Sequence, residues 1–421
     1  MPALTLSKFL ESLSPEEVAD LDRVFEPGTE VTKAALPLEE RGLVVKFRVR
    51  GWDRQCVAGV LGSRGRLLRV LGASSDEEGY RALLSACSNP SKPVEKSFSN
   101  FFEEWRGGLE RLPFIKFFPR DGGRYLTSSI VVACLDGICN SSIHRVMLVS
   151  SDRVVLRVVP RHLHHMHREA LARGTELPIA IVVGAPPQAL VASASSPPYG
   201  VFELEVANAI SSLEVCRTPR FGIPVPCSAS FVIEARLGSD THPEGPFVDL
   251  LKLYDSVRNQ PLAKVEAVYV GYEPSHVVIP SGAEHRLLQS FFREALVWDA
   301  VRRVVPRVCK VRLGGGSWLT IYVSIEKQHE GDSKVAMAAA MAAHPSAKIV
   351  VVLDCDVDLD SLEEIEWAIA TRLRASNGVV IVPRARCSTL DPSSEDGLCD
   401  KLGIDATVSP SERHRFAKAR P

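Results

Sequence analysis

The pattern of hydrophobic and polar residues up to about residue 105 mixes two kinds of secondary structure. A serine, a proline and two glutamates at 14–17 have the composition of a helix start, and helical spacing of apolar residues recurs over 76–87. Short runs rich in valine and leucine at 43–47 and 66–71 are typical of strands. This mixture predicts a small α+β domain over residues 1–105.

Strand-like patterns dominate the middle of the chain, over residues 106–284. Only one clear helical segment, 163–173, interrupts the first four of the apolar runs. Strands that follow one another without intervening helices favour a barrel-like sheet over strict βαβ alternation. The runs that we assign to strands are 129–134, 154–159, 179–183, 231–235 and 264–270.

A long amphipathic segment over 285–306 predicts a linker helix, which Pro306 ends. The region 307–421 then alternates strands and helices in the rhythm of an α/β domain, with a tight turn at 314–316 and a polar, basic tail beyond residue 409 that we expect to be mobile. The alternating segments are helices at 333–343 and 362–374 and strands at 348–353 and 379–382.

The size of the chain agrees with several domains. Its 421 residues, 45% of them hydrophobic, exceed what one hydrophobic core usually serves, so we expect a multi-domain protein of α/β and α+β class. Fifty basic and fifty-one acidic residues give a net charge of -1, which provides no long-range field for binding nucleic acid or an anionic membrane. A small molecule is the expected partner.

The cysteines and the apolar runs indicate the compartment. Ten cysteines are scattered without a CxxC pair, unlike a zinc site or a secreted disulfide framework, so we predict reduced thiols. The apolar runs all fall short of the ~20 residues that cross a bilayer. A cytoplasmic protein without a membrane segment is therefore expected.

Polar residues that can bind a metal and an anion gather in the predicted barrel. A single asparagine or glutamate in such a segment is more often a solvated turn residue than a ligand, so no one of them is decisive. The candidates are Asn140, Arg145, Arg157, Arg161, His162, Glu203, Glu205, Glu244 and Asp249.

Three separated parts of the chain resemble the UbiD family of reversible decarboxylases. The family's asparagine followed five residues later by arginine is matched at 140–145, after the segment 124–127. Its acidic turn, Glu-Gly-Pro-Phe-Gly-Glu in most members, is matched by Glu-Gly-Pro-Phe-Val-Asp at 244–249. Its C-terminal signature is similar to the segments 350–358, 367–372 and 390–392. The resemblance implies that 106–284 is a split β-barrel that binds prenylated FMN.

The resemblance also implies a metal that holds the cofactor phosphate. Asn140, His162 and Glu203 fall on the ligand positions, and an amide, an imidazole and a carboxylate suit Mn²⁺ or Mg²⁺. A potassium ion can accompany the metal in this family. Glu205 is the alternative carboxylate, because the sequence around Glu203 departs from the family pattern.

Further residues fall on positions that contact the cofactor or the substrate. The implied cofactor contacts are Asn140, Ile143, His144, Arg145, Arg157 and His162. In the catalytic set, Arg145 orients the substrate carboxylate, Glu244 supports it electrostatically, and Asp249 is the first choice of proton donor. Val248 replaces a glycine and Asp249 replaces a longer glutamate of many members.

The implied reaction is the decarboxylation of an α,β-unsaturated acid, which requires an organic electron sink such as prenylated flavin. The chain is similar to the archaeal branch that converts trans-anhydromevalonate 5-phosphate to isopentenyl phosphate and CO₂. Lys252, where many members have glycine, is either a solvated lysine or a contact for the substrate phosphate. The alternatives are an aromatic-acid decarboxylase and a non-catalytic flavin-binding module.

Partners follow from the same resemblance. A separate flavin prenyltransferase must supply the cofactor, and a homo-oligomer, a dimer or larger, is expected. The histidine-rich segment 161–167 is compatible with a second metal site, although solvated or intersubunit histidines are the simpler interpretation.

Overall fold

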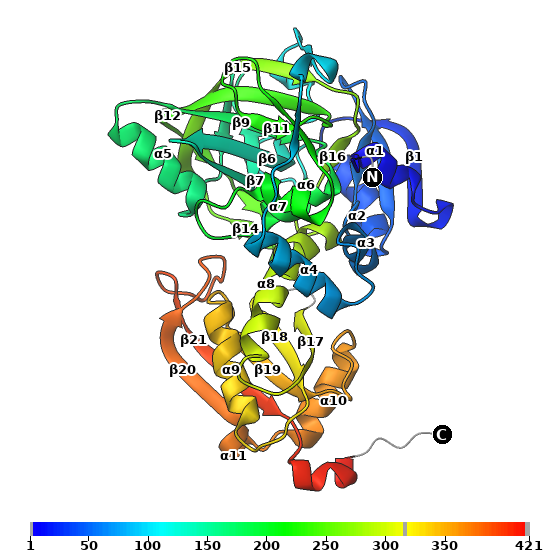
Figure 1. The fold of residues 1–421 in the computed structure, drawn as a ribbon, viewed down its shortest axis with the longest axis vertical. Coiled ribbons are helices and arrows are strands. Elements are labelled where there is room, and N and C mark those ends of the chain that lie inside the picture. The colour runs from blue at the N-terminus through cyan, green and yellow to red at the C-terminus, as the bar shows by residue number, and fades with distance from the viewer. Residues whose placement is uncertain (1–2, 315–317, 417–421) are drawn as a thin grey trace. The chain divides into compact units, whose positions relative to one another are not determined.

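The computed structural model describes residues 3–314 and 318–416, and the chain divides into two compact units (Figure 1). The first unit comprises Met1–Ser74 with Ser85–Leu288, and the second comprises Ser75–Leu84 with Gln289–Pro421. Helix α8 (Ala283–Val301) begins in the first and ends in the second, in agreement with the helix predicted over 285–306.

A closed antiparallel barrel forms the centre of the first unit. The strand order is β12-β9-β6-β7-β8-β15, and a pairing between β12 and β15 closes the ring. The barrel prediction is therefore confirmed, and each of the five predicted strands overlaps a barrel strand. The strands are β6 (Tyr125–Leu135), β7 (Ile138–Leu148), β8 (Arg153–Leu156), β9 (Leu177–Val183), β12 (Phe231–Glu244) and β15 (Arg258–Val270).

The hairpin between β6 and β7 has a local cause in the sequence. Leu135 pairs with Ile138, so Asp136 and Gly137 alone make the turn. Both have positive φ, 52° and 79°, which an Asp-Gly pair adopts readily in a two-residue hairpin turn. The turn fixes the register of β7, the strand that carries the asparagine and arginine of the predicted site.

Of the helices that pack against the barrel strands, the sequence predicted one and missed two. The predicted helix at 163–173 is confirmed as α5 (His162–Ala172). Two more, α6 (Pro187–Ala194) and α7 (Glu203–Ile210), lack an exposed polar face along most of their length, since the first seven residues of α6 are all buried. Without alternation between polar and apolar faces, the helical period is hard to recognise.

Two predictions in the N-terminal part were wrong. The segment that begins at Ser14 makes a single 3₁₀ turn, Pro15–Glu17, and then continues as strand β1 (Val18–Phe25). The segment predicted as a strand at 66–71 is helix α3 (Arg64–Val70), which Ser63 caps by accepting the N–H of Arg66 at 3.2 Å. Tertiary bonds stabilise that helix, because the buried Arg66 guanidinium donates to three backbone carbonyls.

Outside the barrel, the elements between the N-terminus and residue 277 mix short helices and strands. A four-stranded sheet has the order β1-β2-β3-β16. Its elements and those that follow are α1 (Leu6–Glu11), α2 (Glu30–Glu40), β2 (Val44–Val49), β3 (Cys56–Ala58), α4 (Asp76–Ser88), β4 (Val94–Lys96), β5 (Glu103–Glu104), β10 (Glu214–Arg217), β11 (Pro224–Pro226), β13 (Phe247–Val248), β14 (Tyr254–Asp255) and β16 (Ser275–Val277).

The second unit is an α/β domain, as predicted. Its five-stranded sheet has the order β17-β18-β19-β21-β20, and the three central strands are parallel. The turn predicted at 314–316 lies largely outside the described residues, as does the tail from 417, whereas Pro410–Phe416 forms a 3₁₀ helix. The elements are β17 (Val308–Leu313), β18 (Thr320–Ile325), α9 (Asp332–Ala343), β19 (Ile349–Asp354), α10 (Leu362–Arg372), α11 (Ala375–Gly378), β20 (Val379–Arg386) and β21 (Leu398–Ala406).

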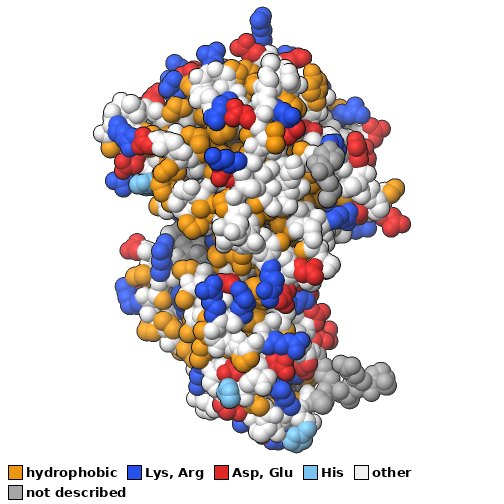
Figure 2. All heavy atoms as spheres, viewed as in Figure 1, with side chains coloured by type: hydrophobic (Ala, Val, Ile, Leu, Met, Phe, Trp, Pro, Cys, Tyr) orange, Lys and Arg blue, Asp and Glu red, His pale blue; other side chains and the backbone are white. Residues whose placement is uncertain are grey.

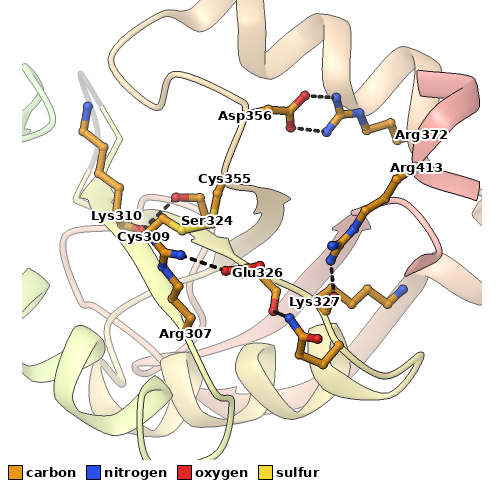
Figure 3. The surroundings of a disulfide bond; sticks show 11 residues. Arg307, Cys309, Lys310, Ser324, Glu326, Lys327, Cys355, Asp356, Arg372 and Arg413 are labelled. Atoms are coloured by element: carbon orange, nitrogen blue, oxygen red, sulfur yellow. Dashed lines mark hydrogen bonds and ion pairs between the residues drawn. A yellow bond between two sulfur atoms is a disulfide. The ribbon is translucent and has the colours of Figure 1, made fainter. Parts of the chain in front are cut away.

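The prediction that all cysteines are reduced thiols was wrong for four of them. Cys134 and Cys139 face each other across the β6–β7 hairpin and form a disulfide. Cys309 on β17 and Cys355, just after β19, form a second one, with Cα atoms 5.7 Å apart (Figure 3). The β6–β7 register brings the first pair together, five residues apart in the sequence. The second pair joins β17 to the end of β19 across the intervening β18, 46 residues apart, and neither spacing forms a recognisable motif.

Surface charge is mixed, as the composition predicts. Figure 2 shows acidic and basic side chains interspersed over the visible face. Across residues 3–314 and 318–416, the helices are all too short or too polar to qualify as membrane-spanning segments.

A pair of buried carboxyl groups joins α2 to the start of α8. Glu284 accepts the N–H groups of Gly59 and Leu61 and is 3.0 Å from His276 Nε2. Its own N–H donates to Glu39 at 2.8 Å, so two buried glutamates are neighbours. Burial, followed by the charge of Glu284, raises the pKa of Glu39 to about 8. Glu39 therefore retains its proton at neutral pH.

The proton on Glu39 should make the stability of the protein depend on pH. An unfolded Glu39 ionises near pH 4.5, and the folded one near 8, so its contribution to stability is complete below 4.5 and is lost as the pH rises through 8. The slope should approach ~1.4 kcal/mol per pH unit in that window. We expect Glu39→Gln to flatten the melting temperature between about pH 5 and about pH 8.

The control is Glu40→Gln. The Glu40 carboxylate is paired with Arg286, which together with other contacts lowers its pKa, so it is ionised throughout the window in both states. Glu40→Gln should leave the pH dependence of the melting temperature as it is in the parent. An unchanged slope in Glu39→Gln would contradict the assignment of the proton.

Candidate functional site

A buried arginine collects three carboxylates at one end of the barrel. Arg145, on β7, is 8% exposed and donates through Nε and Nη2 to both oxygens of Glu244, each at 2.8 Å. Its Nη1 is 3.0 Å from Asp249, and its Nη2 is also 3.1 Å from Asp255. Burial alone would lower the pKa of Arg145, but the bonds with Glu244 and the charges of the two aspartates raise it, so the guanidinium stays charged.

The acidic turn reaches Arg145 because two backbone segments approach very closely. Glu244 is the last residue of β12, and Gly245 has a φ of 95°, which side chains disfavour. The N–H of Gly122 donates to the carbonyl of Pro246 at 2.8 Å. A Cβ at Gly122 would lie 2.0 Å from the Gly245 carbonyl oxygen, so only glycine fits there.

The chain then makes a small hairpin that explains one departure from the family's acidic turn. Strands β13 and β14 pair Phe247 with Asp255 and Val248 with Tyr254. Val248 is therefore a buried strand residue, for which a β-branched side chain is suited. The ring of Phe247 lies under the guanidinium of Arg145, with the centroid 4.6 Å from Cζ.

Asp255 is a member of this site that sequence analysis missed. Besides Arg145, it contacts Arg258 and is 3.7 Å from Nε of Arg157. Burial would raise the pKa of Asp255, but the bond to Arg258 and the charge of Arg145 lower it overall. The available signal was its position after a hydrophobic pair and just before Arg258, the first residue of β15, which no motif includes.

A second polar centre lies further along β7. Asn140 donates to Oε1 of Glu203 at 2.7 Å, and the Ser141 N–H donates to Oε2 at 2.6 Å. Both partners are neutral, and burial raises the pKa of Glu203 to about 8 despite these bonds. A buried carboxyl group of this kind gains stability from a cation beside it, because a nearby positive charge favours the ionised form.

This centre fits the predicted metal ligands in part. Asn140 and Glu203 are brought together, and Glu203 is buried whereas Glu205 is half-buried. His162, the first residue of α5, has its ring 5.4 Å from that of Tyr199. Burial, and then Arg161, lower the pKa of His162, which keeps the imidazole neutral and able to ligate a metal.

The predicted cofactor contacts line the same strand and the next one. His144 is held by Ser142 Oγ and by the Arg157 carbonyl, each 2.8 Å from a ring nitrogen. Burial lowers the pKa of His144 to about 4, so the ring is neutral. Ile143, the residue before His144 on β7, is half-buried. The chain thus places neutral groups around Asn140 and charged groups around Arg145.

Two further histidines of α5 have structural partners. His167 is buried, with Nε2 2.9 Å from the carbonyl of Gly238. The ring of His165 lies 5.2 Å from that of Tyr199. Lys252 is exposed and has a φ of 60°, which is unusual for a residue with a side chain and is readily adopted by the glycine that many family members carry there.

Two domains of one family together match most of this chain. Residues 91–283 match the 3-octaprenyl-4-hydroxybenzoate carboxy-lyase Rift-related domain of UbiD, and residues 286–406 match the C-terminal domain of the same enzymes. The first match contains the barrel with Arg145 and Glu203, and the second contains the five-stranded sheet.

Curated relatives and solved structures agree with these matches. The chain is 42% identical to the anhydromevalonate phosphate decarboxylase of Aeropyrum pernix, over 97% of this chain and 93% of that one, and 37% identical to that of Methanothermobacter thermautotrophicus, over 98% and 99%. The UbiD-class enzyme HmfF from Pelotomaculum thermopropionicum in complex with FMN matches with a TM-score of 0.94 and 32% identity, over 99% and 97% of the chains. An evolved dimeric form of HmfF in complex with prFMN matches with a TM-score of 0.91 and 29% identity, over 100% and 97%. The chain belongs to the UbiD family of carboxy-lyases.

Proposed function

We propose that this enzyme decarboxylates trans-anhydromevalonate 5-phosphate to isopentenyl phosphate and CO₂ with prenylated FMN as cofactor. The observation that carries the proposal is the buried Arg145 with its three carboxylates, in a chain 42% identical over nearly its whole length to an anhydromevalonate phosphate decarboxylase. A binding module for flavin alone would need an anion site but not a charged arginine surrounded by acids.

Arg145, Glu244 and Asp249 have different roles, which follow from how deeply each side chain is buried. The planar guanidinium of Arg145 binds the substrate carboxylate, and Glu244 holds the guanidinium in place through two parallel bonds. The Glu244 side chain is 0% exposed, whereas that of Asp249 is 21% exposed and makes one bond to the arginine. Asp249 is therefore the carboxyl group that can turn toward a substrate and deliver the proton.

The cofactor supplies the electron sink that an sp² carbon requires when it loses CO₂. Asn140, His162 and Glu203 would hold its phosphate through Mn²⁺ or Mg²⁺, with K⁺ as a further ion. Ile143, His144, Arg145 and Arg157 would contact the flavin, and a flavin prenyltransferase would supply it. The exchange of the Asn140–Glu203 hydrogen bond for metal ligation is consistent with the raised pKa of Glu203.

Assembly into a homo-oligomer is part of the proposal. One matching structure is an evolved dimeric form of HmfF, and the two proteins align over nearly their full lengths. Sedimentation equilibrium of the purified protein would give the number of subunits directly.

The substrate assignment predicts a preference for a phosphorylated acid. Holoenzyme should release CO₂ from trans-anhydromevalonate 5-phosphate and not from its dephosphorylated analogue or from 4-hydroxybenzoate. Lys252→Met should raise KM for the phosphorylated acid by roughly tenfold with little change in kcat, because a charge-assisted contact to phosphate is lost. Lys264→Met, at another exposed lysine, is the control. If the enzyme turned over 4-hydroxybenzoate and not the phosphorylated acid, the substrate would be an aromatic acid.

The metal assignment predicts different results for two neighbouring glutamates. Glu203→Gln should lose most bound metal and flavin, since the amide cannot provide a charged ligand, whereas Glu205→Gln should retain both. Metal content by mass spectrometry, flavin absorbance and melting temperature are measured on the same samples. The opposite pattern would transfer the ligand role to Glu205.

The catalytic assignment predicts loss of turnover without loss of flavin. Asp249→Asn should reduce kcat by ~10²-fold or more with little change in KM, because an amide cannot deliver a carboxylic proton. Arg145→Lys should impair both parameters, because a lysine lacks the two-pronged geometry. Normal turnover in Asp249→Asn together with an inactive Glu244→Gln would make Glu244 the donor.

A further inference from the structure

Eight of the ten cysteines of this chain lie in pairs. Four of the ten form the two disulfides described above, and six are free and buried. Four of these six form two further pairs of adjacent thiols on neighbouring antiparallel strands. The two pairs are Cys216 with Cys227 and Cys387 with Cys399.

The first thiol pair lies between β10 and β11. Cys216 pairs with Val225, and the N–H of Cys227 donates to the carbonyl of Glu214 at 3.0 Å. Positions two apart on a strand share a face, so the two cysteine side chains lie on the same side of the ribbon. Cys216 and Cys227 are therefore diagonal neighbours across the two paired strands.

The second thiol pair lies between β20 and β21. Cys399 pairs with Ala385, and the N–H of Cys387 donates to the carbonyl of Gly397 at 2.8 Å. The two sulfur atoms and a carboxylate oxygen of Asp391 lie within 4.8 Å of one another, and all three residues are buried. Burial, and then the neighbouring thiol, raise the pKa of Cys387 to about 11, so its thiolate is disfavoured.

The pair Cys387 and Cys399 could form either a metal site or a disulfide. Asp391 is already neutralised by Lys348, whose Nζ is 2.9 Å from Oδ2, and Oδ1 accepts from the N–H and hydroxyl of Ser393. A structural zinc site normally has four protein ligands, and three are present here. A disulfide leaves this ion pair undisturbed and needs only the two sulfur atoms, which already lie within 4.8 Å of each other, so the observations favour the disulfide.

We propose that Cys216–Cys227 and Cys387–Cys399 are two further disulfide bonds of the folded enzyme. Each bond forms when two thiols lose two protons and two electrons to a disulfide oxidant, such as oxidised glutathione, which leaves as two thiols. Each closes a short loop between adjacent strands and restricts the unfolded chain. The inference is independent of the substrate and of the cofactor.

Counting thiols in the parent protein tests the proposal. The enzyme is equilibrated with a mixture of oxidised and reduced glutathione, unfolded in guanidinium with excess N-ethylmaleimide, and weighed intact. We expect two labels, at Cys56 and Cys87, because Cys56 lies in the apolar core and the Cys87 thiol adjoins Ser195. Prior reduction should give ten labels, one for each cysteine. Six labels, or glutathione attached to either pair, would overturn the proposal.

Variants identify the contribution of each bond. Cys387→Ser should expose Cys399 as a third labelled thiol and lower the melting temperature of the oxidised protein by several degrees, and a reductant should remove most of that difference. Cys87→Ala, at an unpaired buried cysteine, should keep the parent's response to reductant. A different result would overturn this disulfide: the parent binds one zinc ion per chain with Cys387 and Cys399 both reduced, and Cys387→Ser loses that zinc. The pair would then be a metal site.

Discussion

The charged guanidinium of Arg145 in the protein interior is the interaction on which the rest of the site depends. A buried charge is costly unless it is paired and fully hydrogen-bonded. Here both oxygens of Glu244 bind it, and Asp249 and Asp255 complete the shell. The three carboxylates lie on different segments, so strand β7, the end of β12 and the β13–β14 hairpin are fixed relative to one another by the same guanidinium group.

The same strand separates two electrostatic environments. Around Arg145 the groups are charged and paired, whereas around Asn140 and Glu203 the groups are neutral and the carboxyl group retains its proton. Two positions on one strand therefore provide a charged site for a carboxylate and a neutral site suited to a cation. Strand β7 pairs with β6 along most of its length and with β8 over Val146–Leu148, so both sites lie on one fixed strand.

Much of this could be predicted from sequence, and the failures have physical causes. The barrel strands and the acidic turn were found because strand periodicity and a local motif carry them. Asp255 was missed because a hairpin, and not the motif, returns it to Arg145. Helix α3 was mistaken for a strand because its arginine is held by distant carbonyls. The disulfides were missed because one depends on the β6–β7 register and the other joins β17 to the end of β19 across the intervening β18.

Closure of the barrel has a consequence for the order in which the protein folds. Glu244 is the last residue of β12, and its partner in the closing register is Arg258, the first residue of β15. Arg145 and Glu244 lie far apart in the sequence and come together only when β12 has paired with β9 and β15 with β8, and joining such distant segments is the slow step in sheets of this kind. A partly folded chain should therefore have its secondary structure before it can engage the substrate, so competence to bind a carboxylate reports that these long-range pairings have formed.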